Sequence, residues 1–315
     1  DLHSFPTRRS SDLGTSFKFV GETISEERIV SGDYDIDFTI EALEKSIEEK
    51  LNGVFKISTE KKEEKVESKL YTERNTSKPR ERIEHPKVVI PVFPGTNCED
   101  DCTRAFRKEG AEVVQVLIRN LNKEALIESV DRLEKEIRTA QIIMLPGGFS
   151  AGDEPDGSAK FIATVFRNEK IKDAVMDLLN NRDGLMLGIC NGFQALIKLG
   201  LVPYGEIRDI EEDMATLTYN NINRHMSSII RTRISSVKSP WFSEVNAGDI
   251  HNVAISHGEG RFVAPESLLK ELEENGQIAT QYVDFNGEVS LDMPYNPNGS
   301  MLGVEGITSR RSEER

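Results

Sequence analysis

The sequence lacks an excess of basic residues. Its 54 acidic residues outnumber its 40 Lys and Arg residues over 315 positions, which gives a formal net charge of −14. A chain with a negative net charge lacks the basic surface that binds nucleic acid, and it is repelled by anionic lipid. It also lacks an apolar run near the roughly 18 residues of a membrane span, and its start lacks the apolar core of a signal peptide. These absences predict a cytoplasmic globular protein with neither nucleic acid nor membrane as a partner.

Cysteine is scarce. The three cysteines are Cys98, Cys102 and Cys190, too few and too scattered for a disulfide framework or a four-ligand zinc site. Cys98 and Cys102 stand one helical turn apart, so a local packing pair is favoured over metal ligands. The phosphate-binding patterns Gly-Lys-Ser/Thr and G-x-G-x-x-G are also missing. We therefore expect no metal, no nucleotide and no other cofactor in this domain.

Composition divides the chain into segments. Residues 1–13 and 310–315 read as non-native ends, because neither shows the pattern of a domain edge. Residues 14–57 combine a strand-like FKFV with an amphipathic helix and read as the tail of a preceding domain. Residues 58–86 are dominated by charged residues and predict a linker that cannot fold alone. Residues 87–309 form the main domain.

Strands and helices alternate regularly in the main domain. Strands are predicted over residues 88–93, 112–118, 141–145 and 185–189, and helices over 99–108, 123–138 and 158–180. Later strands are predicted over 215–219, 229–234, 252–256 and 278–283, with one helix over 267–274. This order predicts an α/β fold with a doubly wound, mostly parallel sheet flanked by helices. Ligands of such sheets bind at the carboxyl ends of the strands.

The strand predicted over residues 185–189 ends in Cys190-Asn191-Gly192, and a helical pattern follows at once. Gly188 and Gly192 flank Cys190 as small residues flank the nucleophile in a strand-turn-helix elbow. A thiol at the first turn of a helix is exposed to the positive end of the helix dipole, which favours the thiolate. Cys190 is therefore the predicted nucleophile, and a buried structural cysteine is the alternative.

A second glycine pair follows another predicted strand, in the stretch Met144 to Glu154. Backbone amides at Gly147, Gly148 and Phe149 could assemble an oxyanion hole together with the amide of Asn191. A cysteine nucleophile also needs a histidine base and a carboxylate to orient it. On chemistry alone His257, with Glu259 two residues on, is the first choice, and a loop histidine that packs or contacts substrate is an equal alternative.

Five motifs carry a family resemblance, and they fall in order over residues 87–309: FPGTNCE, PGGFSAGDE, GICNGFQ, SHGEGRF and PNGSMLGVEGITS. Together they resemble the class I glutamine amidotransferase domain of the phosphoribosylformylglycinamidine synthase family, in its large single-chain form. Residues 14–55 resemble the end of the synthase portion that precedes this domain. The resemblance implies a flavodoxin-like amidotransferase fold.

The resemblance implies that Cys190 attacks the side-chain amide of glutamine, forms a glutamyl thioester and releases ammonia. The ammonia would reach a synthase portion that uses ATP and Mg to convert formylglycinamide ribonucleotide to the amidine in purine biosynthesis. Gln194 and Asn97 are expected to contact the substrate, and His257 and Glu259 to line the substrate side of the pocket or the interface with the synthase portion. Glutamine and that portion are the expected partners.

The sequence departs from the family at one point. The family's triad His and Glu come from a His-x-Glu-Arg motif beyond the segment matched by residues 303–309, and this sequence has no such motif there. We therefore expect the chain to be a carboxyl-terminally truncated fragment with a nucleophile and oxyanion hole but no proper base. We also expect it to be less stable than an intact domain, because apolar surface and strand edges are left open.

Two other interpretations stay open. One is a catalytically silent module that docks on a synthase partner. The other is a peptidase or stress protein of the wider elbow-cysteine superfamily, although Asn191 and Gln194 suit recognition of a small amide.

Overall fold

The computed structural model describes residues 24–52, 66–76, 82–150 and 159–311, in two compact units that divide after Ile57. In the first unit, β1 (Arg28–Ser31) and β2 (Ile36–Thr39) form an antiparallel pair around the short helix η2 (Gly32–Tyr34), and α2 (Ile40–Asn52) follows. An ion pair between Arg28 and Asp37 crosses the two strands. The strand predicted at FKFV lies outside the described residues.

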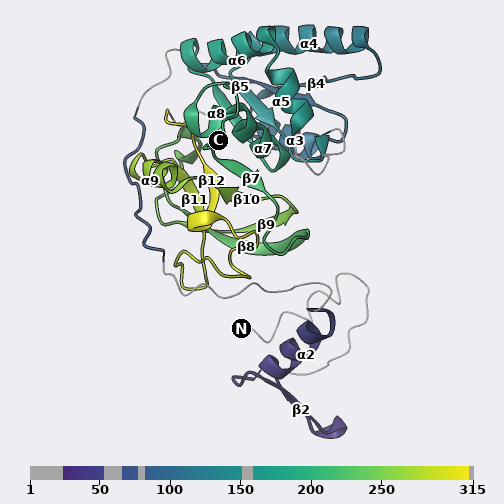
Figure 1. Ribbon diagram of the computed structural model, residues 1–315, viewed down its shortest axis with the longest axis vertical. Coiled ribbons are helices and arrows are strands. Elements are labelled where there is room, and N and C mark those ends of the chain that lie inside the picture. The colour runs from purple at the N-terminus through teal and green to yellow at the C-terminus, as the bar shows by residue number, and fades with distance from the viewer. Residues whose placement is uncertain (1–23, 53–65, 77–81, 151–158, 312–315) are drawn as a thin grey trace. The chain divides into compact units, whose positions relative to one another are not determined.

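A parallel four-stranded sheet forms one half of the second unit, in the order β4-β3-β5-β6. Figure 1 labels two of its strands, β4 and β5. Its strands are β3 (Lys87–Val92), β4 (Glu112–Leu117), β5 (Ile142–Leu145) and β6 (Leu185–Gly188). Each lies within a residue or two of its predicted position. The pairing is parallel throughout, so all four carboxyl ends meet at one edge, as predicted.

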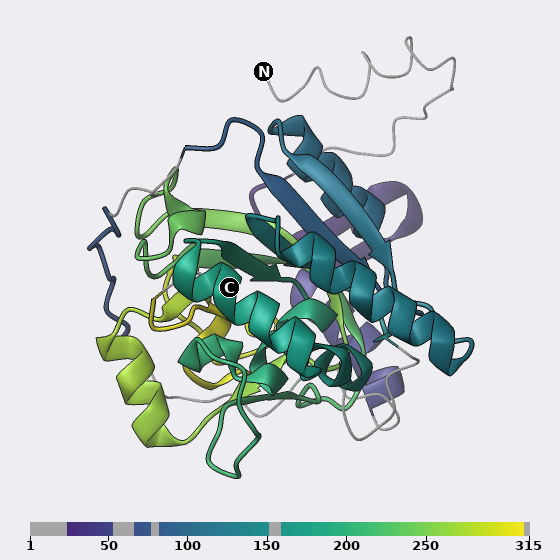
Figure 2. The ribbon, with the colours of Figure 1, turned by 90° about the horizontal axis from the view of Figure 1, so that it is seen from above.

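Helices cover both faces of this sheet. Alternate residues of each strand point to opposite faces, so Val89 and Ile143 pack in the core with the helices α4 and α6, whereas Val88, Ile90 and Met144 pack with α3. Figures 1 and 2 show α4 and α6 side by side. The helices are α3 (Glu99–Lys108), α4 (Lys123–Ile137), α5 (Lys160–Phe166), α6 (Glu169–Asn181), α7 (Asn191–Leu199) and α8 (Leu201–Tyr204).

The prediction of one long helix over residues 158–180 is wrong. Two helices, α5 and α6, occupy this stretch, and the first ends at Phe166 with Arg167 as its C-cap. The Asn168 side chain accepts a hydrogen bond from the backbone amide of Lys170 and begins α6. Asparagine is a strong helix N-cap, and here it restarts the helix in a new direction although the apolar periodicity continues.

The other half of the second unit is an antiparallel sheet in the order β12-β11-β8-β9. Its strands are β8 (Met226–Ile234), β9 (Ile250–His257), β11 (Ile278–Tyr282) and β12 (Val304–Ile307). The strands β7 (Thr216–Thr218) and β10 (Arg261–Val263) form a separate pair, and α9 (Glu266–Glu274), η4 (Pro240–Phe242) and η5 (Met301–Gly303) connect the elements. The pattern predicted four of these strands and missed β10 and β12, which are short.

Part of the predicted linker is bound to this sheet. The Tyr71 amide donates to the Ser235 carbonyl at 2.8 Å, and the Tyr71 carbonyl accepts from the Val237 amide at 3.1 Å. Tyr71 thereby makes a parallel bridge with Ser236. The charged composition predicts that this segment cannot fold alone. Here its backbone is held by hydrogen bonds to the antiparallel sheet.

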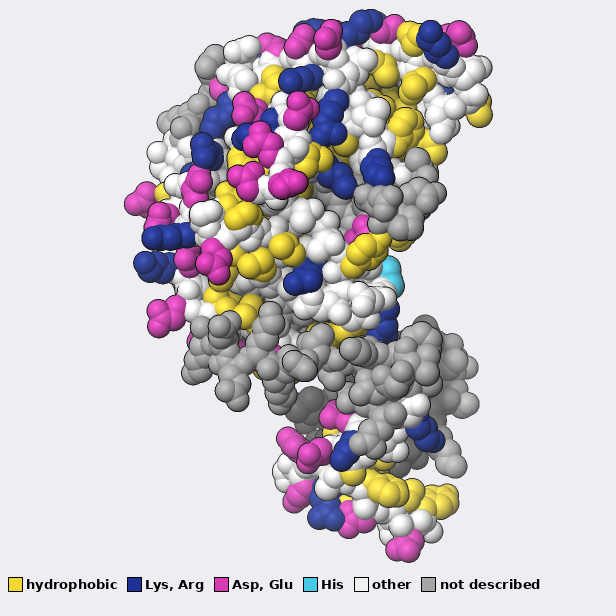
Figure 3. Space-filling view, viewed as in Figure 1, with side chains coloured by type: hydrophobic (Ala, Val, Ile, Leu, Met, Phe, Trp, Pro, Cys, Tyr) yellow, Lys and Arg dark blue, Asp and Glu magenta, His cyan; other side chains and the backbone are white. Residues whose placement is uncertain are grey.

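The described surface carries charges of both signs. Figure 3 shows acidic and basic side chains interspersed over the helical part of the viewed face. Across the described parts of the chain, no helix has the length and apolar character needed to cross a membrane.

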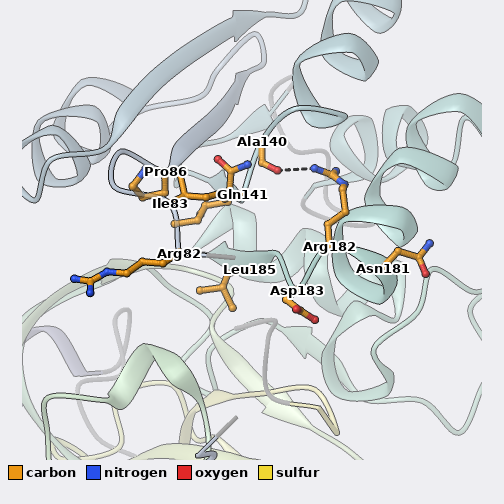
Figure 4. Close-up of a pocket in the computed structure, with 10 residues that line it drawn as sticks. Arg82, Ile83, Pro86, Ala140, Gln141, Asn181, Arg182, Asp183 and Leu185 are labelled. Atoms are coloured by element: carbon orange, nitrogen blue, oxygen red, sulfur yellow. Dashed lines mark hydrogen bonds between the residues drawn. The ribbon is translucent and has the colours of Figure 1, made fainter. Parts of the chain in front are cut away.

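A cavity of about 520 Å³ lies at the amino-terminal ends of β5 and β6, at the opposite sheet edge from the Cys190 turn. Figure 4 shows Arg182 at this site, with its guanidinium pointing toward the Ala140 carbonyl. Arg182 also donates to the Ile137 carbonyl and pairs with Asp177, so it joins the ends of α4 and α6. These contacts give Arg182 a structural role, because they hold the ends of α4 and α6 together.

Candidate active site

Cys190 occupies a strained turn between β6 and α7. Its backbone angles are φ 53° and ψ −111°, a conformation that L-residues rarely adopt, and its side chain is exposed. Cys190 is the N-cap of α7, so the thiol lies at the positive end of that helix. Non-glycine residues held in such conformations concentrate at functional sites, where the surrounding fold maintains the strain. The strand-turn-helix geometry predicted around Cys190 is present.

The glycines around Cys190 allow this turn because side chains have no room there. A Cβ on Gly192 would lie 2.0 Å from the Leu145 carbonyl oxygen, and one on Gly188 would lie 2.6 Å from the Gly192 carbonyl oxygen. Both obstacles are backbone atoms, which cannot move aside without displacing a strand or helix. Close contact between β5 and the start of α7 therefore requires glycine at position 192.

The loop at residues 146–149 lies beside the thiol. A Cβ on Gly147 would stand 3.3 Å from the Cβ of Cys190 and 3.9 Å from its Sγ. The same loop is joined to residues 95–97, because the Asn97 amide donates to the Gly147 carbonyl at 2.9 Å. In return, the Phe149 amide donates to the Gly95 carbonyl at 2.8 Å. This bond occupies the Phe149 amide, so that amide is not available to the predicted oxyanion hole. The parts expected of Gly147, Gly148 and Asn191 stay predictions.

Asn191 and Gln194 connect the elbow to a distant segment. The Asn191 side chain donates to the Gln194 side-chain oxygen at 2.9 Å and accepts from the Ser150 amide at 3.3 Å. Gln194 in turn donates to the Glu259 carbonyl at 2.8 Å. Both amide side chains are almost fully buried, and the hydrogen bonds described above join them to other protein groups. Their expected part in substrate recognition stays a prediction.

A cavity of about 480 Å³ opens beside Cys190. It is mostly apolar, and among the described residues its polar side chains are those of Cys190, Thr232, His251, Thr280 and Glu305. Asn97, Gln194, His257 and Glu259 are not among the described residues that line it. The predicted nucleophile therefore faces a space large enough for an amino acid. Residues 305–307 of the motif PNGSMLGVEGITS form part of its lining, and residues of β8, β9 and η4, which lie outside the motifs, form another part.

Sequence reasoning missed His251 and Glu305 as cavity residues. They come from β9 and β12, the two edge strands of the antiparallel sheet, with β8 and β11 between them. Three strand spacings of roughly 4.8 Å separate such positions, so the two side chains cannot orient one another directly. Glu305 instead accepts a hydrogen bond from the Thr280 hydroxyl. Glu305 lies in the motif PNGSMLGVEGITS and His251 lies in none of the five motifs, and only the strand order brings the two to one cavity.

His257 lies at the end of β9 and is partly buried. Burial, and secondarily the nearby His225 ring, lowers the pKa of His257 and favours the neutral imidazole. Its Nδ1 atom is buried and has no hydrogen-bond partner among the described residues. The segment it begins is held rigidly, since Asn220 donates to the His257 carbonyl and Asn298 donates to the Gly260 carbonyl.

The other two cysteines are not among the described residues that line this cavity. Cys98 resembles Cys190 in being exposed and in being a helix N-cap with positive φ, 69°, whereas Cys102 is half-buried one turn into α3. Burial is the main cause that raises the pKa of Cys102 to about 11, so this thiol stays protonated at neutral pH. Over the part of the chain that the structure covers, no group of three or more His, Cys, Asp or Glu side chains is arranged to hold a metal ion.

A parallel sheet flanked by helices, with a strained cysteine turn at its carboxyl edge and a glycine loop beside it, defines an α/β protein with a strand-turn-helix elbow. The sequence matches the CobB/CobQ-like glutamine amidotransferase domain over residues 85–312. The chain belongs to this glutamine amidotransferase family.

Individual relatives agree with this assignment. The chain is 34% identical over 226 residues to phosphoribosylformylglycinamidine synthase subunit PurQ of Methanococcus maripaludis, covering 71% of this chain and 77% of that protein. It is 31% identical over 224 residues to the same subunit of Aquifex aeolicus, covering 71% and 85%. The solved structure of PurLQS from Thermotoga maritima matches with a TM-score of 0.51 and 24% identity, covering 73% of this chain and 84% of that chain. The last similarity supports the fold.

Proposed function

We propose that this chain is the glutaminase portion of a phosphoribosylformylglycinamidine synthase. The observation that carries the proposal is the exposed Cys190 thiol on its strained turn, beside Gly147 and at the edge of a cavity of about 480 Å³. The names of the PurQ relatives supply the pathway, de novo purine biosynthesis. Glutamine is the proposed substrate.

In the proposed reaction the Cys190 thiolate adds to the side-chain amide carbon of glutamine. The oxygen of the tetrahedral intermediate is negative and would be stabilised by backbone amides at Gly147, Gly148 and Asn191. Collapse breaks the carbon–nitrogen bond, and the nitrogen takes a proton and leaves as ammonia. Water then cleaves the thioester, which releases glutamate and restores the thiol.

The ammonia has its use outside the described domain. We propose that a synthase portion, acting with ATP and Mg, consumes it to convert formylglycinamide ribonucleotide to formylglycinamidine ribonucleotide. The PurQ relatives are named as subunits, and the solved PurLQS structure pairs that name with PurL and PurS. For this chain we propose the single-chain arrangement, on the resemblance of residues 14–55 to the end of a synthase portion. Sequencing the locus upstream would test it, since a stop codon in frame would contradict it.

A glutamine-shaped electrophile tests the substrate. We expect 6-diazo-5-oxo-norleucine to modify the protein at Cys190 and excess glutamine to protect it, because the pocket would hold the amino-acid portion beside the thiol. A dipeptidyl chloromethyl ketone of similar reactivity should label at least about tenfold more slowly. Intact-mass spectrometry measures both. Equal labelling by the peptide reagent would favour the peptidase alternative, and no labelling by either would favour the silent docking module.

The base is a separate question. We propose that the triad His and Glu are not among the described residues, because His257 does not line the Cys190 cavity and His251 and Glu305 stand three strands apart. Loss of a triad base costs several orders of magnitude in rate. We therefore expect glutamine turnover below about 0.01 s⁻¹, against roughly 10 s⁻¹ for a median enzyme. Release of glutamate, followed by a coupled dehydrogenase assay, measures it. Turnover near the median value would show that a base is present.

A further inference from the structure

A short segment of the charged region, residues 68–74, is called the strap here. It lies against the antiparallel sheet through the hydrogen bonds of Tyr71 with Ser235 and Val237. At its start the Arg233 guanidinium donates to the Ser68 hydroxyl at 3.0 Å. The Tyr71 ring also lies against Gly276, where a Cβ would come within 2.4 Å of it. The strap is therefore fixed at several points on the sheet.

Arg74, at the end of the strap, binds a segment 168 residues further along the chain. Its Nη1 donates to the carbonyls of Phe242 and Ser243, at 2.8 and 3.1 Å. Its Nη2 donates to the Val245 carbonyl and, at 3.4 Å, to the Asn246 side chain. One guanidinium thus collects four acceptors, and its planar fork of donors suits such a task.

The segment that Arg74 holds, residues 240–246, is called the wall here. It begins with the three-residue helix η4, whose N-terminus is capped by Ser239. A helix this short leaves its last carbonyls without partners inside the helix. Cationic side chains near a helix C-terminus commonly satisfy such carbonyls. Arg74 supplies this cap from a segment distant in the sequence.

The wall forms one side of the cavity beside Cys190. Trp241, Phe242 and Val245 line that cavity together with the thiol. Trp241 also packs edge-on against Phe106 of α3, with ring centroids 6.4 Å apart. The same residues that face the cavity therefore sit on the backbone that Arg74 caps.

We propose that Arg74 is a positioning residue for the Cys190 cavity: the strap holds the wall, and the wall sets the shape and closure of the space beside the thiol. An effect of Arg74 on glutamine binding rests on the proposed function, whereas its effect on the shape and closure of the cavity does not. Without the guanidinium, the Ser243 and Val245 carbonyls lose this donor and bind water instead, and the Phe242 carbonyl keeps the Val245 amide, at 3.4 Å. The wall therefore opens locally more often.

Trp241 reports on the wall directly, because it is the only tryptophan in the sequence. For R74A we expect the acrylamide quenching constant of its fluorescence to rise at least about twofold, as local opening exposes the ring. Alkylation of Cys190 by iodoacetamide, followed on the Cys190 peptide by mass spectrometry, should accelerate by a similar factor. R74K should fall between wild type and R74A, since an ammonium group lacks the planar fork.

K69A is the matched control, because Lys69 is an exposed cation on the same strap. It should leave quenching and alkylation at wild-type values. Thermal melts of all variants separate a local change from general unfolding. If R74A does not fold, Trp241 quenching and Cys190 alkylation of R74K test the proposal instead. Folded R74A with unchanged Trp241 quenching and Cys190 alkylation would overturn the proposal, even with a lower melting temperature. If the glutamine-shaped reagent does not label the wild-type protein, the proposed function fails. Trp241 quenching and Cys190 alkylation still test the role of Arg74 in that case.

Discussion

Replacing Cys190 with alanine is expected to abolish capture of 6-diazo-5-oxo-norleucine, from about one label per chain to none. The reagent alkylates only a nucleophile held beside its diazo carbon, and Cys190 is the cysteine among the described residues that lines the cavity. C190S should lower the labelling rate by at least about 10³-fold, because a serine hydroxyl is a far weaker nucleophile than a thiolate. Intact-mass spectrometry gives the stoichiometry, and peptide mapping gives the site.

The other cysteines supply matched controls for that result. C98A and C102A should take the label as wild type does, since Cys98 lies on the loop before α3 and Cys102 stays protonated with a pKa of about 11. Label retained by C190A, or found on Cys98 or Cys102, would remove the basis for assigning Cys190 as the nucleophile.

Gly192→Ala is expected to destabilise the domain by about 3 to 5 kcal/mol. The new Cβ would stand 2.0 Å from the Leu145 carbonyl oxygen, so α7 would have to move away from β5. That movement would also shift Cys190, which begins the same helix. Urea unfolding followed by circular dichroism measures the change as a lower midpoint.

Gly258→Ala is the control for the intrinsic effect of replacing glycine with alanine. Its Cβ would meet no atom within 4 Å, so its unfolding free energy should stay within about 0.5 kcal/mol of wild type. If both variants unfold at the same urea concentration, steric contact at the elbow does not limit stability. If G192A is stable but loses labelling by the glutamine-shaped reagent, the contact serves the thiol rather than the fold.

Local sequence patterns predicted the strand over residues 185–189, the turn at Cys190 and the helix after it. Each of these depends on neighbouring residues, because glycines permit the turn and apolar spacing selects strand or helix. The same reasoning failed at residues 158–180, where one capping asparagine, Asn168, outweighed continued apolar periodicity.

The family assignment also came from the sequence, since five motifs in one order carry it and the match over residues 85–312 confirms the amidotransferase class. The position of the motif residues was less predictable. Asn191 and Gln194 are buried in a hydrogen-bond chain that ends at the Glu259 carbonyl. The bond between the two side chains is local, but the other partners, Ser150 and Glu259, lie 41 and 65 residues away, so no local pattern could show that these contacts form.

The sequence by itself determined the alternation of strands and helices, the elbow at Cys190 and the family, because each depends on residues close together in the chain. Only the tertiary structure decided what surrounds the thiol. Strand order brought His251 and Glu305 to the cavity, and docking of a charged segment placed Arg74 on the wall. Such contacts form when chain segments with no shared local signal are packed together, and packing is a property of the whole fold.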